Sequence, residues 1–424
     1  MKKIAFIMLF SALMSTFSFG QVDYSPLKKG LKFNLSADGK VSIKLGFGTQ
    51  IMARYMECNP GVMDSQVNPV TSDADLSLYR TYFSIVGTFH RFTYFVMPAL
   101  TAQPITSSAG PYSLTKPGIF LYDNWLSYQI IPDKLCIGAG LNMFNGISRL
   151  TSSSSAKTLG VDVPVITAPN LITTDQSARQ MSIFISGKLG KFDYRLAFAK
   201  PFRCERTPQI EIAADISNNN LSYKGYFQYQ FFGQETAMMP FYTATYIGEQ
   251  KILNIGAGFD YHPNATASYD WDQNLIKHDK IHFGADIYLD LPLLHNDAIT
   301  FYSAFYYFNY GPNYLLNFGT MNIHPNAISE VQLGTGKSVL VQAAYLLPIA
   351  LRNGEKIQIY AVGTYNDFEA LPKAKVHYDV GVNFFVVGHN LKATLEWQRR
   401  PIYNDLTLVY DYKNLAALRL QVYI

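Results

Sequence analysis

Apolar and polar side chains alternate with a period of two along many segments of this chain. Between Val41 and Tyr55 nearly every odd-numbered residue is apolar, and the even-numbered residues are polar or small. Successive side chains of a β-strand point to opposite faces, whereas a helix would scatter this pattern around its axis. The alternation recurs many times, and the last residues of the chain, 414–424, show it too. The sequence therefore predicts an all-β fold whose strands have one apolar and one polar face.

Sixteen segments have this pattern, and the joins between them alternate between short and long. Long joins are expected at 56–75, 101–118, 146–177, 202–220, 263–279 and 311–336. Outer-membrane barrels have an even number of strands, short periplasmic turns and long extracellular loops. We therefore expect a transmembrane antiparallel β-barrel of about 16 strands, in the segments 41–55, 76–89, 91–100, 119–130, 134–145, 178–189, 191–201, 221–231, 251–262, 280–290, 298–310, 337–347, 356–366, 375–387, 390–399 and 414–424.

One join does not follow the alternation. Residues 232–250 fall where a short periplasmic turn is expected, yet they are long. An additional short strand over residues 241–247 would account for the length and raise the count to 18. The sequence leaves both strand counts open.

The composition agrees with a membrane barrel. Charged residues are 16% of the chain, and Tyr and Phe number 30 and 29 against 3 Trp. The mean hydropathy of +0.02 is too low for a bundle of transmembrane helices, whereas strands with one lipid-facing and one water-facing side fit it. The net charge of +4 is not gathered into long basic runs, so no nucleic-acid partner is expected.

The N-terminus has the pattern of a secretory signal peptide. Lys2 and Lys3 precede an apolar stretch that ends near Gly20, and the stretch is short for a membrane anchor, which is the alternative. We expect a signal peptide at 1–20, a short N-terminal periplasmic hairpin at 21–40 and the barrel at 41–424. Residues 21–40 are too few to form a plug domain, which argues against an energised uptake receptor.

The chain has three cysteines, Cys58, Cys136 and Cys204, so they cannot all pair within one molecule. Cys58 and Cys204 lie in predicted outer loops and could pair if those loops meet, but three free thiols are the simpler interpretation. The cysteine spacing resembles no metal site. His282 and Asp286 share one strand face, but four residues separate them by roughly 13 Å, too far to bind one ion. We expect no metal and no cofactor.

The longest predicted outer loop, 146–177, is a candidate constriction loop. An empty lumen of a barrel this size would pass too much, and porins narrow it with a loop that folds inward. The charged residues of this loop could then set selectivity: Arg149, Lys157, Asp162 and Asp175. The alternative is a solvated loop that packs only against its neighbours.

Strand parity places a set of charged residues on the inner face. Rings of like charge set ion preference in pores, but this set contains both signs. The alternative interpretation is therefore that these residues form pairs of opposite charge that stiffen the wall between strands. The predicted lumen-lining residues are Lys44, Arg54, Arg80, Asp123, Lys188, Arg195, Lys224, Asp286, Asp379, Lys392, Glu396 and Arg419, with Asp193 and Asp260 on the same face.

Residues 122–202 resemble the outer-membrane porins of Bacteroidota placed with the phosphate-selective porin O and P family. The likeness lies in the segments 123–126, 137–141, 145–150, 162–164, 174–180 and 200–202, with a weaker likeness at 253–260 and 418–424. It implies a barrel of 16 strands or nearly so, passive diffusion and a homotrimer. It does not imply phosphate as the solute, because this chain lacks the dense ladder of Lys and Arg that lines the lumen of the founding members.

These observations favour an outer-membrane porin, embedded in outer-membrane lipid, through which small hydrophilic solutes or anions diffuse without catalysis. A non-conducting scaffold barrel of a larger complex is the first alternative, and its mark would be a blocked lumen. The inward tyrosines bear on that alternative: Tyr82, Tyr226, Tyr288, Tyr302, Tyr306 and Tyr360. A barrel lipid hydrolase is the second alternative, and it needs a Ser–His pair with an orienting group that no spacing here identifies.

Overall fold

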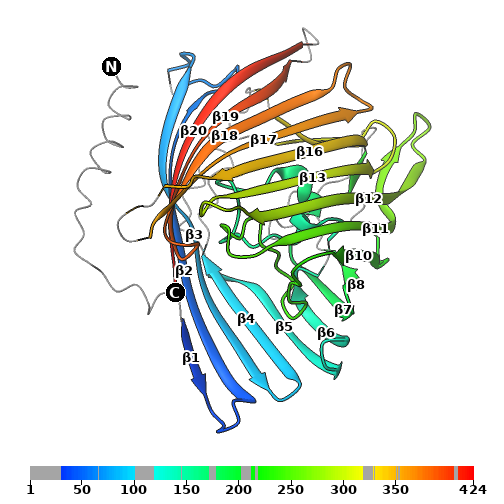
Figure 1. Ribbon diagram of the computed structural model, residues 1–424. Coiled ribbons are helices and arrows are strands. Elements are labelled where there is room, and N and C mark those ends of the chain that lie inside the picture. The colour runs from blue at the N-terminus through cyan, green and yellow to red at the C-terminus, as the bar shows by residue number, and fades with distance from the viewer. Residues whose placement is uncertain are drawn as a thin grey trace.

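The computed structural model describes residues 30–64, 66–100, 119–144, 146–170, 178–201, 212–214, 218–318, 328, 330–349, 351, 354–404 and 409–424. Within these residues, sixteen antiparallel strands close into one barrel, because β2 pairs with β3 on one side and with β20 on the other (Figure 1). The strands of the barrel are β2 (Val41–Glu57), β3 (Ser72–Phe89), β4 (Phe92–Leu100), β5 (Ile119–Ile131), β6 (Leu135–Asn142), β7 (Gln180–Leu189), β8 (Phe192–Lys200), β10 (Ser222–Gln230), β11 (Ile252–Tyr269), β12 (Leu275–Pro292), β13 (Ala298–Asn309), β16 (Gly336–Leu346), β17 (Lys356–Phe368), β18 (Lys375–Val387), β19 (Leu391–Asn404) and β20 (Val409–Tyr423).

The predicted all-β barrel is confirmed, and each of the sixteen predicted segments forms a strand. The count of 18 is wrong, because residues 241–247 form no strand of the barrel. The predicted long join at 263–279 is also wrong. Beyond a register shift between His262 and Thr266, β11 and β12 go on pairing as far as Tyr269 and Leu275, so only 270–274 joins them. The irregularity at the shift interrupts the alternation in the sequence.

The two ends of the barrel differ in the length of their connections. The end that we assign to the periplasm, called the turn end below, has tight turns at 90–91, 132–134 and 190–191. His90, Asp133 and Gly190 adopt positive φ angles of 51°, 59° and 64° there, as tight turns require. The opposite end, called the loop end below, has the long connections apart from residues 232–250, which lie at the turn end.

The described residues also form four short strands that are not part of the barrel wall. β1 (Leu31–Asn34) pairs with β2, so the chain reverses direction over residues 35–40 before it enters the barrel. β9 (Ala213–Ala214) pairs with the extended part of β11 at the loop end. β14 (Leu315–Phe318) and β15 (Glu330–Gly334) form a hairpin within the connection between β13 and β16.

The outer surface of the barrel is apolar and the inner surface is largely polar. On β7 the outward Ile183 is 54% exposed, whereas its neighbours Ser182 and Phe184 are buried. The same contrast on β12 leaves Phe283 53% exposed beside the buried His282. A closed barrel with an apolar exterior satisfies its backbone groups internally and shows lipid only apolar side chains. The predicted outer-membrane localisation is therefore confirmed.

The described residues include no helix that is both long enough and apolar enough to span a bilayer.

Candidate functional site: the constricted bore

The connection between β6 and β7 lies inside the barrel. It contains two short 3₁₀ turns, η1 (Arg149–Ser152) and η2 (Val165–Thr167), and most of its residues from Ile147 to Asn170 are buried. Figure 1 shows the strands wrapped around an interior that holds these turns. The structure describes residues 146–170 of the predicted constriction loop, and these are called the in-folded loop below. Residues 171–177, with Asp175, lie outside the described residues.

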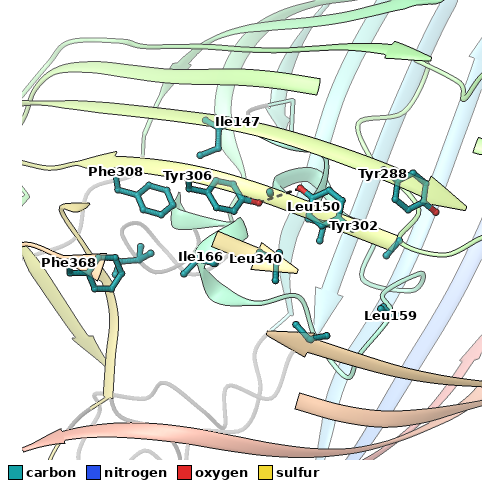
Figure 2. Packing of buried hydrophobic residues seen from close by; sticks show 14 of the residues in the cluster. Ile147, Leu150, Leu159, Ile166, Tyr288, Tyr302, Tyr306, Phe308, Leu340 and Phe368 are labelled. Atoms are coloured by element: carbon teal, nitrogen blue, oxygen red, sulfur yellow. Dashed lines mark hydrogen bonds between the residues drawn. The ribbon is translucent and has the colours of Figure 1, made fainter. Parts of the chain in front are cut away.

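The in-folded loop packs on an aromatic part of the inner wall. Leu150 and Ile166 belong to one buried apolar cluster with Tyr302, Tyr306 and Leu340 of β13 and β16 (Figure 2). The Ser148 and Tyr306 hydroxyls are 2.9 Å apart, which adds a polar contact at the edge of the cluster. Burial of apolar surface stabilises this position of the loop.

Two glycines provide the space for the start of the loop. Gly258 of β11 and Gly284 of β12 face each other across the two strands. A Cβ atom would lie 2.7 Å from the Ile147 carbonyl oxygen at Gly258, and 2.4 Å from it at Gly284. Because non-bonded contacts this short do not occur, the close approach of the Ile147 backbone to the wall requires glycine at both positions.

Charged wall residues hold the middle of the loop. Arg419 of β20 donates hydrogen bonds to the carbonyl oxygen of Val161 and, over 3.2 Å, to that of Gly160. Lys392 of β19 donates to the Thr158 carbonyl oxygen over 2.9 Å, and Glu396 accepts from the Val161 backbone N–H over 3.1 Å. These predicted lumen-lining residues thus fix the backbone of the in-folded loop.

A β-bulge in β3 brings two side chains to Asp162. The register against β2 shifts between Gln50 and Ile51, so Tyr79 is the extra residue beside Arg80. Both side chains then reach Asp162: the Tyr79 hydroxyl donates to its carboxylate, and Arg80 Nη2 lies 2.8 Å from Oδ2. Bulges commonly redirect a side chain in this way. Arg80 and Asp162, predicted separately as wall and loop residues, form one ion pair.

Arg149 connects the loop to a second in-folded segment. Its Nη2 atom is 2.6 Å from Oε1 of Glu235 and 2.7 Å from the carbonyl oxygen of Thr243, while its backbone N–H donates to Asp286 over 2.7 Å. The guanidinium also stacks on Tyr288, 3.8 Å from the ring centroid. Burial raises the pKa of Glu235, but Arg149 and the other hydrogen-bond donors outweigh that effect and hold it below its usual value.

Residues 232–250, called the turn segment below, enter the bore from the turn end. Tyr242 exchanges backbone hydrogen bonds of 2.8 Å with Ser152 and Ser154, and the Ala244 N–H donates to the Lys157 carbonyl oxygen over 3.0 Å. The Tyr242 ring also lies 3.9 Å from the Arg195 guanidinium carbon. The sequence left open an additional short strand over residues 241–247, but these residues form an irregular layer against the in-folded loop.

Most of the remaining predicted wall residues form pairs on the inner face. Arg54 pairs with Asp75, and the other pairs are Asp123 with Arg179, Arg195 with Asp193, and Lys224 and Lys280 with Asp260. His377 Nε2 lies 2.7 Å from Asp379. Asp286 accepts hydrogen bonds from Tyr226 and Tyr302. The structure thus brings these residues together as wall contacts and not as a ring of like charge.

Four predicted lysines have no ion pair among the described residues: Lys392, which donates to the Thr158 carbonyl oxygen as described above, and Lys44, Lys157 and Lys188. Lys44 is exposed near the turn end, Lys188 is half-buried, and Lys157 is exposed although residues 158–160 after it are buried. These three side chains therefore reach solvent from the bore or its mouth.

The sequence did not identify Glu235, Tyr242, Tyr79 or the paired glycines as site residues. The length of residues 232–250 at a place for a short turn was the only signal for the first two. The bulge at Tyr79 and the close approach at Gly258 depend on pairing with distant segments, which parity within one strand does not reveal.

The described residues give little support to the lipid hydrolase alternative. The Ser268 hydroxyl and His278 Nε2 are 3.2 Å apart at the loop end, but no orienting carboxylate or amide contacts His278 among the described residues. Within the residues that the structure describes, no group of three His, Cys, Asp or Glu side chains lies close enough together to bind a metal ion. Among the described residues Cys58 and Cys136 are free thiols, as the simpler interpretation of the sequence expects; Cys204, the possible partner of Cys58, lies outside the described residues.

Solved structures show what this barrel is similar to. The crystal structure of the outer-membrane channel DcaP of Acinetobacter baumannii matches with a TM-score of 0.53 and 10% identity, over 92% of this chain and 99% of that chain. The chain has the porin fold. OmpF of Salmonella typhi, solved with daunomycin, matches over 93% of this chain and 100% of its own, with a TM-score of 0.53 and 9% identity.

OprB of Pseudomonas putida matches this porin fold equally well, with a TM-score of 0.53 and 9% identity over 90% of this chain and 94% of its own. No protein-family model and no curated protein sequence matches the chain. At these identities the likeness concerns the fold alone, so the function is argued from the bore.

Proposed function

We propose that this protein is an outer-membrane porin through which small hydrophilic solutes or ions diffuse passively. The observation that supports the proposal most strongly is the in-folded loop, which Arg419, Lys392 and Glu396 fix to the inner wall of a sixteen-stranded barrel. A loop held across the bore narrows the lumen and filters solutes by size and charge. The protein itself carries out no chemical step.

Single-channel conductance of the refolded protein in a planar bilayer tests this function. Steady open steps are expected, and the reversal potential under a KCl gradient gives the ion preference. A folded and inserted protein that shows no steps would exclude the porin function.

The non-conducting scaffold barrel is the second candidate, and one observation favours it. The inward tyrosines Tyr82, Tyr226, Tyr288, Tyr302, Tyr306 and Tyr360 are all buried, because the in-folded loop and the turn segment cover them. In this function the filled bore would be permanently closed. The conductance measurement separates the two functions, since a permanently closed barrel gives no current under any voltage.

We also propose that the protein belongs with the Bacteroidota porins of the phosphate-selective porin O and P family and assembles as a homotrimer. The motif segments 123–126, 145–150 and 174–180 support the family, and the homotrimer follows from that resemblance. Analytical ultracentrifugation in a density-matched detergent tests the trimer, which predicts about three times the chain mass of 47.7 kDa. A single species at the chain mass would exclude it.

A further inference from the structure

Among the turn-end connections that the structure describes, residues 232–250 are the one element that leaves the wall and enters the bore. The turn between β10 and β11 could have been tight, because the Gly233 N–H already donates to the Lys251 carbonyl oxygen over 2.9 Å and continues the hairpin pairing. The chain between these two residues is therefore not needed to join the strands. Its side chains are nevertheless mostly buried from Pro240 to Ile247, and Glu235 is buried as well.

The turn segment contacts strands that lie far apart around the barrel wall. Phe241 packs against Phe95 of β4, with ring centroids 6.1 Å apart. A few residues later, Thr245 accepts a hydrogen bond from Gln358 of β17 over 3.0 Å, and its carbonyl oxygen lies 2.8 Å from His389 beside β18. The segment itself starts between β10 and β11. It therefore extends across the bore and does not follow one side of it.

The in-folded loop and the turn segment contact each other along the middle of this crossing. The three backbone hydrogen bonds between residues 152–157 and 242–244 make a short two-layered contact, and the Arg149–Glu235 ion pair joins the layers beside it. The loop contacts β20 through its own residues, because the Gln421 side chain donates to the Ala156 carbonyl oxygen over 2.9 Å. Together the two segments make wall contacts on strands from β2 to β20.

We propose that residues 232–250 are the second half of the filter of this channel. The narrowest part of the bore then lies at a partition built from two segments that enter from opposite ends, and the solute class is restricted to ions and small solutes. Tyr242 and Glu235 are positioning residues, because they hold the two halves together. The inference rests on the proposed channel function, because a filter requires a conducting pore. The partition itself can be tested without that function.

The test replaces residues 234–250 with Asn-Gly, so that Gly233 and Lys251 are joined by a two-residue hairpin turn. Single-channel conductance of this variant should rise severalfold, and larger uncharged sugars should enter liposomes that contain it. A matched control replaces the exposed tip 270–274 with the same two residues and should leave conductance unchanged. Heat-resistant migration in detergent gels verifies that both variants fold.

Cys136 provides a second readout that needs no current. It lies on the inner face of β6 close to the turn end, and its strand partner on β7 is Ser186. The next inward residue of β7 is Phe184, which belongs to the cluster against which Phe241 packs. In cells that lack other porins and carry Cys58→Ser and Cys204→Ser, a small charged maleimide added outside reaches Cys136 only past the partition. Its labelling rate should rise in the shortened variant and stay low in the control.

The outcomes separate this inference from the proposed function. A conducting parent with an unchanged shortened variant, in both current and labelling, would overturn the second filter half and leave the porin intact. A silent parent whose shortened variant conducts would support the partition and exclude the porin function. A shortened variant as silent and as poorly labelled as a silent parent would overturn both.

Discussion

Arg149 and Glu235 form a two-pronged ion pair inside the barrel, with Nη2 2.6 Å from Oε1 and Nη1 2.5 Å from Oε2. Each side chain is at most 5% exposed, and the two residues are supplied by connections at opposite ends of the barrel. Breaking a buried pair leaves one charge without its partner, which costs about 3–5 kcal/mol, whereas replacing both charges with apolar groups is often neutral.

A double-mutant cycle on this pair should therefore be strongly non-additive. We expect Arg149→Met and Glu235→Met each to lower the free energy of unfolding by about 3–5 kcal/mol, and the double variant to lose much less than the sum. Urea unfolding in detergent micelles, followed by tryptophan fluorescence, measures all four proteins. Additive losses would mean that the two side chains do not interact in the folded barrel.

The glycines opposite Ile147 should be sensitive to a single methyl group. In Gly284→Ala, the new Cβ would meet the Ile147 carbonyl oxygen at 2.4 Å, so the start of the in-folded loop must move off the wall. We expect a folded barrel with noisier and larger conductance. Gly363→Ala is the matched control, because no atom lies within 4 Å of a Cβ there. Equal conductance in both variants would contradict the close fit.

The strands could be predicted from sequence because lipid imposes a local rule. Outward positions that face the hydrocarbon core must be apolar, so residues such as Ile183 and Phe283 mark their strands without reference to the rest of the chain. The inner face has no such uniform solvent. The sequence predicted Arg419 and Asp286 as charges that face a water-filled lumen. Both instead bind the in-folded loop, because the loop occupies the space of water there.

The partition could not be predicted for a related reason. Glu235 lies 86 residues from Arg149 in the chain, and no periodicity links an irregular turn to an irregular loop. The bulge at Tyr79 depends on the register of β2 against β3, which one strand alone does not show. What the sequence did contain was an excess of length at 232–250, and that excess enters the bore.

The lipid-facing surface makes a stability prediction that does not involve the bore. Val341 is at the centre of β16, points outward and is 41% exposed. We expect Val341→Lys to lower the free energy of unfolding by about 2–4 kcal/mol, the cost of a lysine near the bilayer midplane. Leu294→Lys, at a residue 95% exposed in a turn, should cost little. Urea titrations in phospholipid vesicles make the comparison, and equal losses would argue against a lipid-facing Val341.

The ion preference of the channel should respond to Lys157. Its side chain reaches solvent from the in-folded loop, and none of the described residues forms an ion pair with it. A charge at a constriction changes the local concentration of counter-ions, so Lys157→Glu should shift the reversal potential under a KCl gradient towards cation preference. Lys337→Glu, at an exposed residue on the outer face of β16, should shift it little. If the two variants behave alike, the permeation path does not pass Lys157, and ions cross the partition elsewhere.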